Sequence, residues 1–149
     1  MTEPLFEVTN HQNHTVGQVG RWSGLDQYTF QTYPGKLFLK NAMRLTGMEV
    51  SLNKLPPGVE VPFLHKHRKH EELFIFVKGK GQFQVDGQTM DVSEGTVIRV
   101  APEGVRTWRN NSSEDLYYVV VQANSQTPCE AEIADGIGID GPVEWPPED

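Results

Sequence analysis

Three histidines and two glutamates fall within one short stretch of the chain, at His65, His67, His70, Glu71 and Glu72. Residues two apart on an extended strand point to the same face, so His65 and His67 could bind one metal ion together. Imidazole nitrogens with a carboxylate oxygen form a ligand set suited to zinc and to iron(II). This stretch therefore predicts a metal site.

The residues before the histidines indicate which way the imidazoles point. Val59, Val61 and Phe63 are apolar and share the parity of His65 and His67. If this segment is an extended strand, its apolar face lies inward, and both imidazoles lie inward with it.

Glu72 begins an apolar run and shares a face with Phe74 in an extended strand. A carboxylate buried on such a face needs a partner, and two imidazoles would provide one. Spacing alone does not separate Glu72 from the adjacent Glu71 as the third ligand. His70 falls at the expected bend, and we interpret it as a loop residue.

A second interpretation of the same stretch needs no metal. Lys66, Arg68 and Lys69 lie among the histidines, and the segment could be a solvated basic loop. Spacing weighs the two interpretations about evenly.

Short strands must position these residues. Glycine and proline divide residues 47–123 into short segments rich in Val, Phe, Tyr, Ile and Thr, which is typical of an all-β sandwich or barrel. Asp86 and Gly87 predict a two-residue hairpin turn between residues 81–85 and 88–92. We expect further strands at residues 106–110 and 116–123.

Composition excludes several classes of protein. The chain has 149 residues, with 13 Lys and Arg against 20 Asp and Glu, giving a formal net charge of −7. That length fits one domain, and the acidic balance argues against nucleic acid and against an anionic membrane as partners. The single cysteine, Cys129, excludes an intramolecular disulfide and any zinc site built from several thiolates. Neither a signal peptide nor a membrane-spanning run is recognisable, so we expect a cytoplasmic protein.

Two groups of residues resemble the paired motifs of the cupin superfamily. The first motif is matched by Gly58, His65, His67, Glu72 and Gly79, and the second by Gly95, Pro102, Gly104 and Asn111. The resemblance covers roughly residues 45–123. It implies an antiparallel β-barrel of the jelly-roll type with a metal bound in its mouth.

One position departs from the family's pattern. The second cupin motif carries a metal-binding histidine where this chain has Thr107, so only His65, His67 and Glu72 carry over. A neutral hydroxyl is a poor ligand for a transition metal. The site would then hold Fe, Zn, Mn or Ni weakly, or lose the metal and leave a polar pocket for an organic ligand.

Other residues near this position are candidates for substrate binding. Arg109 shares strand parity with Thr107 and could hold a carboxylate or phosphate, pair with Glu72, or lie on the surface. We assign Arg109, Thr107 and Phe74 to substrate binding, with barrel core as the alternative for Phe74. Trp108 is expected to point away from Thr107.

We therefore expect one cupin domain over residues 1–149. Its barrel core spans about 45–123, preceded by an N-terminal arm with extra strands (1–44) and followed by an extended tail (124–149) that Trp145 pins to the body. The predicted function is a metal-binding cupin acting on a small molecule, with oxygenase, isomerase or lyase chemistry and no assigned catalytic residue. The alternatives are a metal-free binding or sensing module and a structural role, and in each case the resemblance implies a homodimer.

Overall fold

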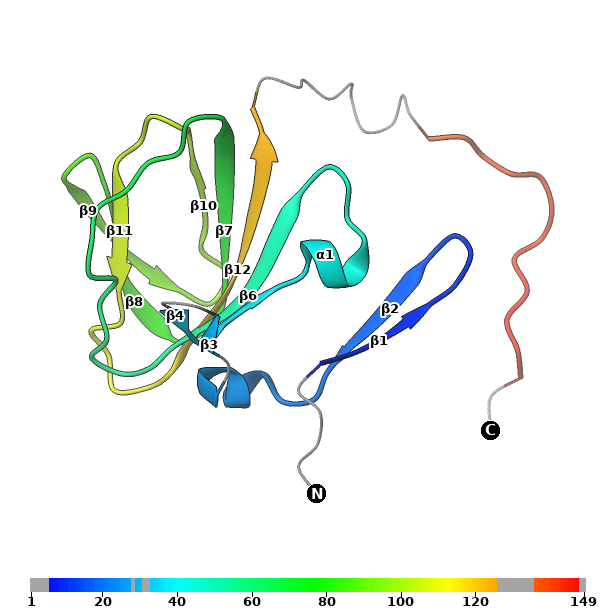
Figure 1. The fold of residues 1–149 in the computed structure, drawn as a ribbon, viewed down its shortest axis with the longest axis horizontal. Coiled ribbons are helices and arrows are strands. Elements are labelled where there is room, and N and C mark those ends of the chain that lie inside the picture. The colour runs from blue at the N-terminus through cyan, green and yellow to red at the C-terminus, as the bar shows by residue number, and fades with distance from the viewer. Residues whose placement is uncertain (1–5, 28, 31–32, 126–135, 148–149) are drawn as a thin grey trace.

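Two antiparallel sheets face each other and enclose the core of the molecule (Figure 1). The computed structural model describes residues 6–27, 29–30, 33–125 and 136–147. The larger sheet has the order β10 (Val97–Val100), β7 (His70–Lys78), β12 (Leu116–Asn124), β6 (Glu49–Leu55) and β5 (Lys36–Phe38). The smaller sheet has the order β11 (Arg106–Arg109), β8 (Lys80–Val85) and β9 (Gln88–Ser93). The predicted all-β jelly-roll architecture is confirmed.

The hairpin between β8 and β9 forms where the sequence predicts it. Asp86 and Gly87 have φ of 50° and 81°, and Val85 pairs with Gln88. Both turn residues thus adopt the left-handed conformation that a type I′ turn requires. The turn between β7 and β8 depends on Gly79, because its φ is 96° and a Cβ there would overlap the carbonyl oxygen of Asp115.

An aromatic cluster fills the space between the two sheets. Phe74 lies in the middle of it, with its ring centroid 4.7 Å from that of Phe83 and 4.9 Å from that of Trp108. The indole N–H of Trp108 donates a 2.7 Å hydrogen bond to the hydroxyl oxygen of Tyr118, so the polar atoms of this core are paired.

The segment that carries His65 and His67 is not the regular strand that the sequence predicts. It runs beside β11 through two isolated bridges, Glu60 with Arg109 and His65 with Arg106. Val59 and Phe63 are each 40% exposed, so the expected continuous apolar face is not buried.

The described residues of the N-terminal part of the chain form several short elements. β1 (Phe6–Asn10) and β2 (Thr15–Val19) pair as a hairpin beside the barrel (Figure 1). The 3-10 helix η1 (Trp22–Gln27), two-residue strands β3 (Thr29–Phe30) and β4 (Tyr33–Pro34), and the short helix α1 (Lys40–Met43) follow. η1 packs on β6 with Leu25 fully buried, and Trp22 donates to the backbone oxygen of Asn53 at 3.0 Å.

The outer face of the larger sheet is aliphatic. Strand pairing aligns Val97, Ile75, Val119, Leu52 and Leu37 across all five strands. η1 lies against β5 and β6, and Leu37 is only 5% exposed, whereas Val97 is 56% exposed at the opposite edge.

Residues 136–147 of the C-terminal tail contain neither helix nor strand. The prediction that Trp145 pins the tail to the body is wrong, because its side chain is 84% exposed. Cys129 lies outside the described residues.

Within the ranges that the structure describes, no helix is long and apolar enough to span a membrane.

Candidate metal centre

The structure brings His65, His67 and Glu72 together at one end of the barrel. Each offers one ligand atom, and the three atoms lie within 4.8 Å of one another. The two histidines come from the segment before β7, and Glu72 is the third residue of β7.

Backbone hydrogen bonds hold the two histidines in place. The His65 N–H donates to the oxygen of Arg106 at 3.1 Å, and the Arg106 N–H donates back to the oxygen of His65 at 2.9 Å. The His67 N–H donates to the oxygen of Pro102 at 3.1 Å. Glu72 is held by β10 and β12, which flank β7 in the sheet. Three separate backbone contacts therefore fix the geometry of the cluster.

The ligand atoms themselves lack hydrogen-bond partners among the described residues. His65 Nδ1, His67 Nε2 and Glu72 Oε1 are buried and form no hydrogen bond, and the same is true of Arg106 Nε, which lies at ion-pair distance from Glu72 Oε1. His67 Nε2 lies 3.1 Å from Glu72 Oε1, an ion-pair distance that lacks hydrogen-bond geometry. Buried polar atoms without hydrogen bonds are costly, and a divalent ion bound by His65, His67 and Glu72 would give each of the three ligand atoms a partner. The residues therefore fit a metal.

Both imidazoles are held neutral, which is the form that binds metals. Burial, with the nearby charge of Arg106 and contributions from His67 and Lys36, lowers the pKa of His65 to about 4. Burial also lowers the pKa of His67, and Glu72 opposes that shift.

The adjacent Glu71 and His70 are excluded from the cluster by their other contacts. Glu71 faces away and accepts a 3.0 Å hydrogen bond from Arg99 Nε. His70 begins β7 and does not lie in a loop, and its Nδ1 is 3.2 Å from Gln122 Oε1. Spacing alone left open whether Glu71 or Glu72 is the third ligand. Strand alternation places Glu72 in the cluster.

The side chain beside Glu72 from β11 is that of Arg106, not Thr107 or Arg109. Arg106 is fully buried, and its Nε lies 3.2 Å from Glu72 Oε1. Its other nitrogens donate to the backbone oxygens of Gly104 at 2.8 Å and Ala101 at 3.3 Å. A cation therefore lies next to the one carboxylate of the site.

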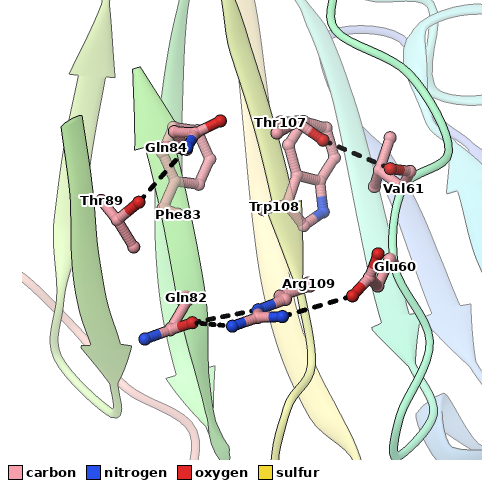
Figure 2. Close-up of a pocket in the computed structure, with 9 residues that line it drawn as sticks. All are labelled: Glu60, Val61, Gln82, Phe83, Gln84, Thr89, Thr107, Trp108 and Arg109. Atoms are coloured by element: carbon pink, nitrogen blue, oxygen red, sulfur yellow. Dashed lines mark hydrogen bonds and ion pairs between the residues drawn. The ribbon is translucent and has the colours of Figure 1, made fainter. Parts of the chain in front are cut away.

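Thr107 and Arg109 lie on the opposite face of β11 and do not line the barrel cavity. Of the three positions left open for Arg109, the structure shows the one on the surface. Thr107 and Arg109 line a pocket of about 330 Å³ beside the smaller sheet. Figure 2 shows their side chains among the other residues that line it. Thr107 donates to the oxygen of Val61 at 3.3 Å, and Arg109 contacts Gln82 and Glu60. Trp108, which alternates with them, lies in the core.

Phe74 is fully buried among aromatic rings and does not line the cavity, so its predicted contact with substrate is not supported by its position. The cavity beside the ligand cluster has a volume of about 290 Å³. Its polar lining residues include Lys36, Asn53, His65, His67, Glu72, Tyr118 and Gln122.

Sequence reasoning missed the roles of Arg106 and Lys36 at this site. A signal existed for Arg106, because it shares strand parity with Trp108, the one large apolar residue of its segment. No local signal marks Lys36, which reaches the cavity through the pairing of β5 with β6.

Comparison with known proteins agrees with this architecture. Residues 51–122 match the family model described as a cupin domain. A crystal structure of a cupin protein from Bacteroides fragilis is 27% identical, with a TM-score of 0.70, and the match covers 87% of this chain and 99% of that one.

Two further matches, one of sequence and one of structure, are to Thermotoga maritima. An oxalate-binding protein is 29% identical over 85 residues, which cover 57% of this chain and 69% of that protein. A predicted oxalate decarboxylase of known structure is 27% identical with a TM-score of 0.53, and the match covers 61% of this chain and 77% of that one. Together with the two facing sheets and the His65, His67 and Glu72 cluster, these likenesses identify the chain as a member of the cupin superfamily.

Proposed function

We propose that this protein binds one divalent transition metal through His65, His67 and Glu72 and acts as an enzyme on a small molecule in the adjoining cavity. The observation that carries the proposal is the convergence of three buried, unsatisfied ligand atoms within 4.8 Å of one another. Fe, Zn, Mn and Ni all accept two nitrogens and one oxygen as protein ligands. Three protein ligands, in place of the four that are usual in the family, imply that the metal ion is held weakly.

Such an ion would supply Lewis-acid or oxygen-activating chemistry to a bound substrate. The chain's own contribution is a cavity of about 290 Å³ in which two neutral imidazoles and a held carboxylate are already oriented. That volume suits a small molecule.

The names of the Thermotoga relatives make oxalate the first compound to test, and oxygenase, isomerase and lyase reactions all stay open. The catalytic residues stay unassigned.

Metal analysis of untagged protein tests the proposal. Protein purified without chelator and then supplied with Fe(II), Mn(II), Zn(II) or Ni(II) should retain about one ion per chain by mass spectrometry. His65→Ala and His67→Ala should lose it, whereas the control His14→Ala, in the hairpin outside the barrel, should keep it. Wild-type protein that takes up none of the four ions would overturn the proposal.

A metal-free binding module is the second candidate. The observation that favours it is the 3.2 Å contact between Arg106 Nε and Glu72 Oε1, since a buried guanidinium competes with a metal for that carboxylate. In this case the cavity would bind an organic ligand directly, without a metal ion. The same metal analysis would then find no metal in a protein that still binds small molecules.

We also propose that the protein forms a homodimer through the aliphatic outer face of the larger sheet. Val97, Ile75 and Val119 lie in one row across neighbouring strands there, and Val97 is 56% exposed. Contiguous apolar surface of this kind is typical of an interface. Light scattering should give a dimer mass that Val119→Glu reduces to a monomer, whereas Thr89→Glu on the smaller sheet leaves it unchanged. A monomeric wild-type protein would contradict this.

A further inference from the structure

Lys36 extends from β5 into the same cavity as the candidate metal ligands. Its Nζ lies 3.5 Å from Ser51 Oγ and 5.5 Å from the centroid of the Phe38 ring. Among the described residues it forms no ion pair, although it pairs through its backbone with the buried Asn53. A desolvated ammonium beside one hydroxyl and one aromatic ring has unused hydrogen-bond donors.

The other charges of the cavity are already paired. Glu72 is the one carboxylate among its described lining residues, and it lies against the Arg106 guanidinium. Lys54 also lines the cavity, but its Nζ donates to the Ser23 oxygen at 2.7 Å and lies 3.8 Å from Asp115. Lys36 thus leaves the cavity with an uncompensated positive charge.

The electrostatic environment of Lys36 is consistent with a positive charge in the cavity. Burial lowers its pKa to about 8, and the charges of Glu72 and Glu49 oppose the shift without cancelling it. The side chain stays mostly protonated at neutral pH. Its charge also contributes to the lowered pKa of His65, so its field reaches the ligand cluster.

We propose that Lys36 binds a carboxylate group of the substrate and so selects small carboxylic acids for this cavity. The inference rests on the proposed function, because it assumes that the cavity receives a substrate. The ammonium would form a charge-assisted hydrogen bond with one carboxylate, while the rest of the molecule lies toward His65, His67 and Glu72. Lys36 is then a specificity-determining residue outside the two cupin motifs.

Calorimetry with two probes of similar size tests the charge dependence. Malonate should bind metal-loaded wild-type protein, and Lys36→Met should weaken it by about tenfold or more, as expected for a lost hydrogen bond to a charged group. Lys36→Arg should recover most of the affinity, and the control Lys80→Met, at an exposed lysine of β8, should not change it. The neutral diamide of malonate should not distinguish wild type from Lys36→Met. Equal malonate affinity in wild type and Lys36→Met would overturn the inference.

A labelling experiment on the wild-type protein avoids any folding defect of the variants. Malonate should protect Lys36 from amine acylation, measured by peptide mass spectrometry with Lys80 as the internal reference. Undiminished labelling would also overturn the inference.

Metal content separates the two proposals. Lys36→Met should retain the wild-type amount of metal, because Lys36 is not a ligand. If wild type holds metal but binds neither malonate nor oxalate, the role of Lys36 is wrong and the metal site stands. If it holds no metal but binds malonate through Lys36, the metal site is wrong and the anion site stands.

Discussion

Arg106 and Arg109 lie on the same short strand, and each is within ion-pair distance of a glutamate. Arg106 Nε is 3.2 Å from Glu72, and Arg109 Nη1 is 3.3 Å from Glu60. The side chain of Arg106 is fully buried, whereas that of Arg109 is 48% exposed. Nearly equal distances therefore describe different interactions. Water screens the outer pair, while the inner pair has lost its hydration and each charge depends on the other.

Removing the inner arginine should have the largest effect. Arg106→Met would leave Glu72 without its cationic partner and Gly104 O without its side-chain donor. We expect a loss of about 3 to 5 kcal/mol in the free energy of unfolding of the metal-free protein, measured by urea denaturation. A loss below about 1 kcal/mol would show that the two arginines are equivalent, since exposed pairs contribute in that range.

Replacing residues on the two faces of β11 by histidine sharpens the comparison. Arg106→His places an imidazole beside Glu72, so metal retention should rise about tenfold or more, since even outer partners of metal ligands change affinity by 10- to 100-fold. Thr107→His, the matched variant on the outer face, should leave metal affinity unchanged. Dialysis against a metal buffer measures both. If Thr107→His, and not Arg106→His, raised the metal affinity, position 107 would be the one that faces the metal site.

Acid should lower the free energy of unfolding of the metal-free protein through the buried His65. The folded protein holds the pKa of His65 near 4, below its ordinary value of 6.5. Between these values the unfolded chain binds more protons, so stability falls as pH decreases from 6.5 toward 4. Denaturation at pH 7, 5.5 and 4.5 should show this slope, and it should be shallower in His65→Gln. An unchanged slope in that variant would assign the effect to other groups.

The smallest effect is expected on the outer face. Arg109→Gln should change the free energy of unfolding by less than about 1 kcal/mol, because its partners are exposed. Metal content and malonate binding should be unchanged. A larger loss, or any loss of ligand, would give the pocket of Figure 2 a role in the site.

Features controlled by neighbouring residues could be predicted from the sequence. The hairpin at Asp86 and Gly87 follows from local conformational preference. The spacing of His65 and His67 correctly predicted one cluster, although the regular strand expected to carry them does not form. The two-residue period of β11 was also predicted, with Trp108 opposite Thr107. The period alone does not say which face is buried, and the motif match assigned the wrong one.

Other features depend on contacts between distant parts of the chain. Lys36 reaches the cavity because β5 pairs with β6, and no pattern around Lys36 encodes that pairing. Extra strands were predicted for residues 1–44, but the β1 and β2 hairpin could not be placed, because its strands are short and partly polar and their alternation is weak. His67 lines the cavity although its segment is not a regular strand, since backbone bonds to β11 and to Pro102 replace a sheet ladder.

The two carbonyl contacts of Arg106 have a consequence for how this site can change by mutation. Besides pairing with Glu72, Arg106 donates to Gly104 O and Ala101 O, which belong to the loop that leads into β11. A histidine in its place is too short to serve as ligand and loop support at once. An ancestor with a fourth imidazole would therefore have needed a differently stabilised loop, and single substitutions between the two states would pass through a less stable protein. The arginine and its loop are expected to be inherited together.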